Sequence, residues 1–556
     1  MRKLVLVGGV AVVLAGLGLW FLGRPAYRHF KERRAMTQAR EFAGKGDFRN
    51  ASLSARQALL VNPRNADACR LMAELSELAR STNALDWHRR VAEIEPTAEN
   101  RLRVAAAALR FQPPPFPLAT EILEELAGSA TNLAAFHVVA AERALKLKRI
   151  PEAAAHFEAA GRLEPANEQH QLNLAVLNLQ STNAATADAA RATLDRLRAS
   201  TNLAAVALRW LVGESLKNRD YAAAERYSNQ LLEDRQCSLE DRLQHLGLLR
   251  EGNPAAFPEA LEAAKRHAST NAAEIYGLSA WMLSHQLADQ ALEFLESCPE
   301  AVRKRQPVPM AFVDVYLAKK DWEALETFLL AEKWGELDFI RLAFLSRAAA
   351  EQGQTQAADV RWRSAIREAA DRLGPLTSLL SMATQWKRQK AREELLWQIT
   401  QRFPREKWTL RELDRLYGET GNTRGLHKLY SHIAGYDTSN VVAQNNLAAT
   451  SLLLRLNLPR AHEIARDLYQ RHPEDAVITS TYAYSLHLQG RTPDALAALE
   501  KLPPQALEQP SVALYYGCLL SAAGRTNQAA RYLELARHGT LLPEEKQLLA
   551  AAGGAS

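Results

Sequence analysis

A small set of residue types returns in the same order along most of this chain, with a period of about 34 residues. Near the start, Ala51 is followed seven positions later by Ala58, and near the end Ala529 is followed at the same spacing by Ala536. A fixed period of this length is typical of chains in which one supersecondary unit is stacked many times. This period constrains the fold more strongly than any other feature of the sequence.

Each unit contains what two antiparallel helices need in order to pack closely. A helical hairpin cannot bury its apolar face alone, so it stacks on the next hairpin. Small residues are needed where the helices cross, and glycine readily adopts the left-handed conformation that ends a helix. We expect turns at Gly46, Gly353, Gly421, Gly490 and Gly524. We expect buried residues early in the second helices at Ala51, Ala84, Ala153, Ala224, Ala358, Ala461, Ala495 and Ala529, and seven positions later at Ala58, Val91, Ala160, Leu231, Ala365, Leu468 and Ala536.

These residues and their spacing resemble the tetratricopeptide repeat. The resemblance is clear over residues 35–235 and 405–540, and it implies an all-α, right-handed solenoid of helix-turn-helix units. No segment shows the period-2 alternation of a half-buried strand. Because a solenoid grows in one dimension, a chain of 556 residues needs no single globular core.

The phase of the repeat predicts four regions. They are an apolar segment with a basic flank (1–34), an N-terminal array (35–239), divergent helical repeats (240–400) and a C-terminal array (401–556). In the divergent region the period drifts and large residues replace small ones, which suggests altered crossing angles and a bend. The favoured interpretation of the tryptophans there is that they fill the core; they are Trp281, Trp322, Trp334, Trp362, Trp386 and Trp397.

The net charge of +6 comes entirely from the N-terminal region. Residues 1–34 hold seven basic residues and one acidic residue; subtracting these from 69 basic and 63 acidic residues leaves 62 of each in the body. A nucleic-acid scaffold needs a basic surplus on its body. We therefore expect no nucleic-acid partner, and we interpret the basic stretches 303–305 and 387–390 as solvated helix faces.

Residues 4–22 form an uncharged, mostly apolar run. At about 1.5 Å per residue, a helix of this length just crosses a hydrocarbon core of about 30 Å. The alternative is a cleavable signal peptide, but the run is long for an apolar signal region of about 7–15 residues, and no convincing small-residue cleavage site follows it. We expect a single-pass anchor that contacts the lipid bilayer through residues 4–22. A secondary hypothesis is self-association through the small-residue face of Gly8, Ala11, Ala15 and Gly18.

The side of the membrane on which the body lies stays open. More basic residues follow the apolar segment than precede it, which favours a cytoplasmic body. A basic start before an apolar run instead suggests a signal anchor that exports the body, and this gives a slight preference for an extracytoplasmic location. The four cysteines, Cys69, Cys237, Cys298 and Cys518, are far apart in sequence, which predicts free thiols and leans weakly toward a reducing compartment.

No catalytic motif is found. The sequence has no glycine-rich phosphate loop, no Gly-x-Ser-x-Gly elbow, no Cys-x-x-Cys and no His-Glu-x-x-His. His427 and His432 are five positions apart, which is off the usual ligand spacing of four. We therefore expect no catalytic residues, no metal site, no cofactor and no enzymatic activity.

The resemblance to tetratricopeptide proteins implies a concave groove, lined by the first helices, that takes extended peptides or partner helices. The repeat positions that face such a groove point to Met36, Arg40, Arg70 and Glu74 in the N-terminal array, and to Asn446, Thr450, Ser480, Tyr484 and His487 in the C-terminal array. The family's clamp for carboxyl-terminal peptides needs Lys and Asn at set positions, and Met36 and Arg40 do not match it.

Together these features predict a bacterial, membrane-anchored scaffold whose groove binds partner proteins or peptides. Envelope assembly, secretion and polysaccharide export are the settings we expect. The alternative is a non-catalytic, substrate-binding subunit of an envelope enzyme complex. The two hypotheses differ in whether the chain is recovered with one stable enzyme subunit or with many peptide clients.

Overall fold

The computed structural model describes residues 26–179 and 181–553, and every regular element in these ranges is a helix. The chain divides into two compact units, the first ending at Val315 and the second beginning at Tyr316. The division falls inside one helix and coincides with neither of the predicted array boundaries near residues 239 and 400. Those boundaries stay predictions based on the repeat phase.

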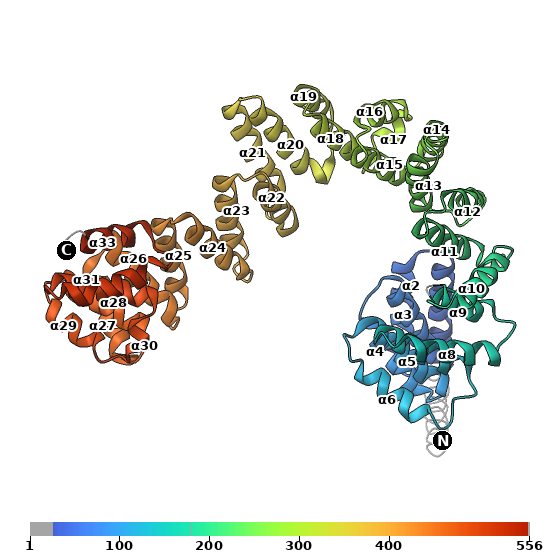
Figure 1. Cartoon of the computed structure of the whole chain (residues 1–556), viewed down its shortest axis with the longest axis horizontal. Helices are drawn as coiled ribbons and strands as arrows, with labels where there is room; N and C mark the ends of the chain where they lie inside the picture. The colour runs from blue at the N-terminus through green and yellow to red at the C-terminus, as the bar shows by residue number, and fades with distance from the viewer. Residues whose placement is uncertain (1–25, 180, 554–556) are drawn as a thin grey trace, which may run out of the picture. The chain divides into compact units, whose positions relative to one another are not determined.

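The first unit begins, within the described residues, with a helix over residues 26–44 (Figure 1). It continues with α2 (Phe48–Val61), α3 (Ala66–Leu78), α4 (Asn83–Ile94), α5 (Ala98–Phe111), α6 (Pro117–Leu126), α7 (Ala134–Lys146), α8 (Ile150–Leu163), α9 (Glu168–Asn178), α10 (Ala184–Leu197), α11 (Ala204–Lys217), α12 (Tyr221–Glu233), α13 (Leu239–Gly252), α14 (Phe257–Ala268), α15 (Ala272–Ser284), α16 (Ala288–Ser297) and α17 (Glu300–Arg303).

Helix α18 (Val308–Lys319) contains the division between the units. The second unit continues with α19 (Trp322–Ala331), η1 (Gly335–Leu337), α20 (Asp338–Glu351), α21 (Thr355–Ala369), α22 (Leu373–Gln385), α23 (Gln389–Arg402), α24 (Trp408–Thr420), α25 (Thr423–Tyr436), α26 (Val441–Leu454), α27 (Leu458–Arg471), α28 (Ala476–Leu488), α29 (Thr492–Leu499), α30 (Pro504–Leu507), α31 (Pro510–Ala522), α32 (Thr526–Arg537) and α33 (Pro543–Gly553).

Consecutive helices pack as hairpins, which confirms the predicted helical repeat. The strongest pairings join helices that follow each other in sequence, such as α20 with α21, α31 with α32 and α7 with α8. All the predicted small residues of the second helices are buried, and so are the residues seven positions later. The period therefore marks the two points at which each second helix touches its neighbours most closely.

The turns inside the hairpins share one backbone conformation. The five predicted turn glycines all have left-handed φ values, between +60° and +78°. The following N–H then bonds back into the first helix, as in Asn422 N to Tyr417 O at 2.8 Å. Seven further turns place a residue with a side chain in the same conformation, which costs about 1–2 kcal/mol at each site. These residues are Arg80, Lys148, Arg219, Gln286, Lys320, Lys387 and Arg455.

The tryptophans of residues 240–400 are only partly core residues. Trp334, Trp362 and Trp397 are buried, as the favoured interpretation predicted. Trp322 and Trp386 are partly exposed, and the guanidinium of Arg347 lies over both rings, at 5.6 and 5.1 Å from their centroids. Trp386 still packs against the apolar core that contains Trp362, so the cation covers only one face of its ring. Trp322, and Trp281, which stacks on His285, are partly exposed and do not simply fill the core.

The described helices include none that is both long enough and apolar enough to cross a membrane. The predicted anchor at residues 4–22, with its small-residue face, lies outside the described residues. The four cysteines are free, as expected, with Cys69 and Cys298 fully buried.

Candidate functional site

The predicted groove residues of the N-terminal array divide into one core residue and a surface network. Met36 is buried against Ala39, Ala55 and Leu59, so it faces the core of the first hairpins. Its predicted exposure to a partner is wrong, because the helix over residues 26–44 turns this apolar side chain toward α2 and α3. Arg40, Arg70 and Glu74 do lie on the surface or partly exposed.

Arg40 and Arg70 come together through one carboxylate. Asp67 accepts from Arg40 Nη2 and from Arg70 Nη1, both at 2.8 Å. Arg70 also forms an ion pair with Glu95. These arginines are already partnered on an exposed surface, where such pairs contribute little to stability.

The predicted groove residues of the C-terminal array are mostly not accessible. Thr450, Ser480 and Tyr484 are buried. Thr450 and Ser480 donate to carbonyls of their own helices, at 2.7 Å to Asn446 O and 2.8 Å to Val477 O. Their predicted role as exposed contacts is therefore wrong, since their hydroxyls have internal partners. Asn446 and His487 remain partly exposed.

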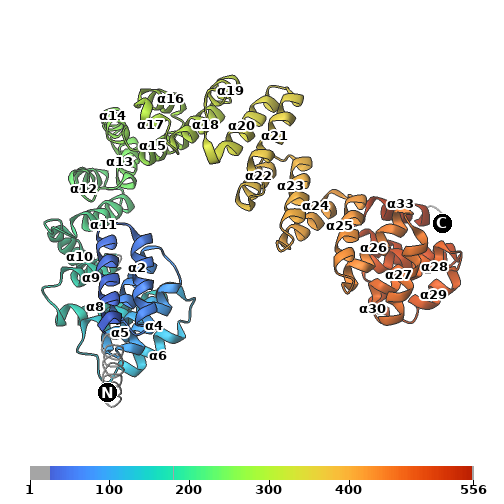
Figure 2. The same ribbon diagram turned by 180° about the vertical axis from the view of Figure 1, so that it is seen from behind.

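Helix α33 of the same chain covers this part of the C-terminal array (Figures 1 and 2). It packs against α31, α32 and α26. Its Leu548 and Leu549 lie against the apolar cluster that contains Tyr484 and Tyr515. The hydroxyl of Ser521 donates to the carbonyl of Ala552 at 3.0 Å. The first helices α26 and α31 therefore face a helix of their own chain, and Tyr484 of α28 belongs to the same apolar cluster, at the place where a partner was predicted.

Acidic side chains hold the start of α33. The hydroxyl of Tyr515 donates to Glu545 Oε1 at 2.8 Å, and that of Thr423 on α25 donates to Glu544. Burial, followed by the charge of Glu545, raises the pKa of Tyr515 far above its ordinary value, so the phenol stays a donor. No side chain of α33 is fully buried, and the helix packs on the array through the partly buried Leu548, Leu549 and Ala552.

In contrast to the surface of the C-terminal array that α33 covers, a groove of the first unit is open to solvent. A cavity of about 950 Å³ lies between α7, α8, α9 and α11, and we call it the α7–α11 groove. Ten of its sixteen lining residues are apolar. Two of them, Ile150 and Trp210, are 47% and 39% exposed. Large apolar side chains left open in a concave site are typical of a surface that binds a partner.

Polar groups in the α7–α11 groove are neutral amides and hydroxyls, with one exception. Gln169 and Asn173, one turn apart on α9, bond to each other at 2.9 Å and keep further donors and acceptors free for a main chain. The exception is Glu142 on α7. Burial raises the pKa of this carboxyl group, although Arg110 and Lys146 act against the shift.

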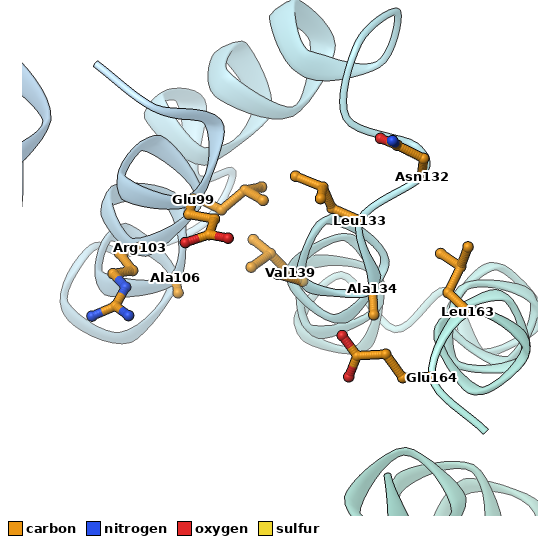
Figure 3. Close-up of a pocket in the computed structure, with 11 residues that line it drawn as sticks. Glu99, Arg103, Ala106, Asn132, Leu133, Ala134, Val139, Leu163 and Glu164 are labelled. Carbon is orange, nitrogen blue, oxygen red and sulfur yellow. The ribbon is translucent and has the colours of Figure 1, made fainter. Parts of the chain in front are cut away.

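A smaller cavity of about 340 Å³ lies between α5, α7 and the end of α8 (Figure 3). Leu133 and Val139 point from the α7 side toward Glu99 on α5, while Leu163 and Glu164 line the opposite side. Leu163 is a further exposed apolar residue. The first helices α5 and α7 therefore present a second hollow on the same unit.

The basic stretch at residues 387–390 is not simply a solvated face. Lys387, Arg388 and Lys390 line a cavity of about 510 Å³ in the second unit. Arg388 lies 4.8 Å from the ring centroid of Trp362, donates to Ser346 Oγ at 2.8 Å and reaches Asp359 at 3.5 Å. For Arg388 the sequence interpretation is wrong, because its guanidinium joins three helices.

In the part of the chain that the structure describes, no group of three or more His, Cys, Asp or Glu side chains is placed to hold a metal ion. His427 and His432 are not brought together as ligands. His427 Nδ1 lies 3.4 Å from Thr450 Oγ1, and His432 packs edge-on against Trp397. The helices thus supply apolar surface and hydrogen-bonding groups, which suit binding.

Sequence reasoning missed the α7–α11 groove. Its key residues, Glu142, Val176 and Trp210, come from three hairpins, and none stands out in the repeat pattern.

No protein-family model and no curated protein sequence matches the chain. Among solved structures, it is similar to the APC/C hetero-tetramer Cut9–Hcn1 (11% identity, 96% of this chain and 99% of that chain, TM-score 0.27). It is also similar to Naa15/Naa10 bound to HypK-THB (14% identity, covering 94% of this chain and 77% of that chain, TM-score 0.31). A third similar structure is Pseudomonas aeruginosa PilF (18% identity, covering 43% of this chain and 92% of that chain, TM-score 0.24). With every TM-score below 0.5, these likenesses do not decide what the chain binds.

Proposed function

We propose that this chain is an interaction scaffold that binds segments of partner proteins in the α7–α11 groove. In the same proposal, residues 4–22 hold it at a membrane, and its work belongs to envelope assembly, secretion or polysaccharide export in a bacterium. The partners are proteins and not nucleic acids, because the body of the chain carries as many acidic as basic residues.

One observation supports this proposal above the others. The first-helix surface of the C-terminal array is covered by α33, whereas the α7–α11 groove leaves Ile150 and Trp210 open to solvent. Burying one large apolar side chain contributes about 1.5–3 kcal/mol. Because both side chains are already more than half buried, an occupant that covered both would gain about half of that for each, roughly 1–3 kcal/mol in total, before any polar contact is counted.

The neutral amides of the α7–α11 groove suit a peptide main chain. Gln169 and Asn173 can donate to carbonyls and accept from N–H groups of an occupant without the cost of moving a charge out of water. This combination of apolar walls and a few amides is the usual composition of sites that bind other molecules.

The test compares two substitutions of the same kind in the full chain. Trp210→Glu places a charge in the groove, and Leu60→Glu places one on α2, where Leu60 is 82% exposed and is not one of the residues that line the groove. Cross-linked complexes are purified from the cells that express each variant and quantified by mass spectrometry. We expect Trp210→Glu to lose partners that Leu60→Glu retains; identical partner sets would contradict the proposal.

A second experiment tests the membrane part of the proposal. Fusions of the chain's C-terminus to alkaline phosphatase and to a reporter active only in the cytoplasm give opposite signals for the two topologies. Phosphatase activity in membrane fractions would support an exported, anchored body. Activity of either fusion in soluble fractions alone would contradict the anchor.

A further inference from the structure

Among the residues that the structure describes, Glu142 is the only charged one that lines the α7–α11 groove. It is partly buried, and within the described residues its carboxylate makes no hydrogen bond and no ion pair. Neither of the two nearby cations pairs with the Glu142 carboxylate. Arg110 on α5 is paired with Glu77 at 3.3 Å, and Lys146, one turn further along α7, is exposed to solvent and does not reach Glu142.

An unpartnered carboxylate among apolar walls is unfavourable in the empty groove. Burial takes water away from the charged form, and the raised pKa of Glu142 reports this cost. A buried charge is tolerated much better when an opposite charge and hydrogen bonds accompany it. The groove therefore has an unmet requirement for a cation, at a fixed place between apolar surfaces.

We propose that the occupant of the α7–α11 groove is an apolar segment of a partner protein that carries one lysine or arginine, and that this cation pairs with Glu142. The inference rests on the proposed function and adds the chemical identity of what the groove recognises. Val176 on α9 and Val206 and Trp210 on α11 form the apolar wall that covers the rest of the segment.

The other classes of occupant fit less well. An acidic segment would place like charges together in a desolvated site, which costs several kcal/mol in interfaces of this kind. A wholly apolar segment would remove the remaining water from the carboxylate and provide no partner for it. A cationic side chain alone, without apolar neighbours, would leave Ile150 and Trp210 exposed.

The test is a selection of random 16-residue peptides displayed on phage, with the full chain held in lipid nanodiscs so that no detergent enters an apolar groove. Four targets are compared: the unchanged chain, Glu142→Gln, Glu142→Lys and Trp210→Glu. We expect peptides enriched on the unchanged chain to combine apolar residues with one Lys or Arg, and to be lost on Trp210→Glu. On Glu142→Gln the preference for Lys or Arg should disappear, and on Glu142→Lys it should change to Asp or Glu.

Affinities of the best peptides then give the size of the effect. Because a hydrogen bond to a charged group contributes about 1.5–3 kcal/mol, Glu142→Gln should weaken binding about 10- to 100-fold. Thermal unfolding of the variants controls for folding, and Glu142→Gln, which removes an unpaired charge, should leave the melting temperature unchanged or higher.

The outcomes separate this inference from the function on which it rests. Peptides that are lost on Trp210→Glu but have no preference for Lys or Arg would overturn the role of Glu142 and leave the groove as a binding site. Peptides that bind the unchanged chain and Trp210→Glu alike, or no enrichment at all, would overturn both proposals.

Discussion

The hydroxyl of Tyr515 on α31 donates a hydrogen bond of 2.8 Å to Oε1 of Glu545 on α33. The other oxygen of this carboxylate accepts from the backbone N–H of Leu542 at 2.9 Å, so Glu545 also caps the helix that it attaches. One side chain therefore couples the start of α33 to its position on the C-terminal array.

Replacing Tyr515 by Phe should loosen α33 without unfolding the unit. The substitution removes one donor to a carboxylate, a loss of about 1–3 kcal/mol. Amide hydrogen exchange of α33 should become about tenfold faster or more, while α28 and α31 exchange at unchanged rates. Tyr532→Phe is the matched control, because in the described structure the Tyr532 hydroxyl has no hydrogen-bond partner. Equal effects of the two substitutions would contradict the role of the bond to Glu545.

Gly425 should not tolerate a side chain. A Cβ at this position would lie 2.4 Å from ring atoms of Tyr417, which is fully buried. The ring cannot move freely because the indole N–H of Trp397 donates to its hydroxyl at 2.7 Å, and that hydroxyl donates to Glu393 at 2.6 Å. We expect Gly425→Ala to lower the free energy of unfolding by about 1–3 kcal/mol, measured by urea denaturation.

The control for this substitution lies in the same helix. A Cβ at Gly435 on α25 would meet no atom within 4 Å. Because alanine is favoured over glycine inside helices, Gly435→Ala should be neutral or stabilising by up to about 1 kcal/mol. Similar destabilisation by both changes would show that packing against Tyr417 is not the cause.

Arg219→Gly should stabilise the protein. Arg219 has a φ of +58° in the turn between α11 and α12, where a side chain is unfavourable and glycine is not. The exposed side chain of Arg219 lines the turn without a hydrogen bond in the described structure. We expect a gain of about 0.5–1 kcal/mol after the greater freedom of glycine in the unfolded chain is subtracted. Arg226→Gly, inside α12, should instead lose about 1 kcal/mol; a gain at Arg226 or a loss at Arg219 would contradict the explanation.

Stability should fall in mild acid partly because of His245. Burial lowers the pKa of this imidazole, whose Nδ1 lies 3.0 Å from Ser228 Oγ. In the unfolded chain the pKa is about 6.5, so the unfolded state takes up a proton first. Stability is therefore full above about pH 6.5 and declines as the pH falls toward the lower pKa of the folded state.

Urea denaturation at about pH 7.5 and about pH 5.5 measures this loss, on either side of the ordinary histidine pKa. His245→Asn removes the titrating group while keeping a polar one beside Ser228, so the difference between the two pH values should become smaller. His538→Asn changes an exposed histidine and should leave the difference as it is. An unchanged difference in His245→Asn would exclude this residue as the cause.

The spacing of small residues was enough to predict the helical hairpins. Ala51 and Ala58, Ala153 and Ala160 lie at helix crossings, and any larger side chain there would push the helices apart. Such local requirements leave a trace in the sequence because few residue types satisfy them: alanine at the first crossing point, and alanine or an aliphatic residue such as Leu231 seven positions later. At a turn such as that of Arg219, the left-handed conformation is adopted by a residue with a side chain at moderate cost. The residue type there does not reveal the turn.

The sequence by itself therefore determined the repeated hairpin, its crossing points, five of its turns and the balanced charge of the body. Only the tertiary structure decided which first-helix surface is covered and which is open. Whether Tyr484 faces a partner or lies beneath α33 depends on Leu548 and Glu545, more than 60 positions away in sequence. Glu142 and Trp210 meet in one groove because the α7, α9 and α11 helices stack. Contacts between successive hairpins depend on how each hairpin is rotated relative to the next, and no single repeat encodes that rotation.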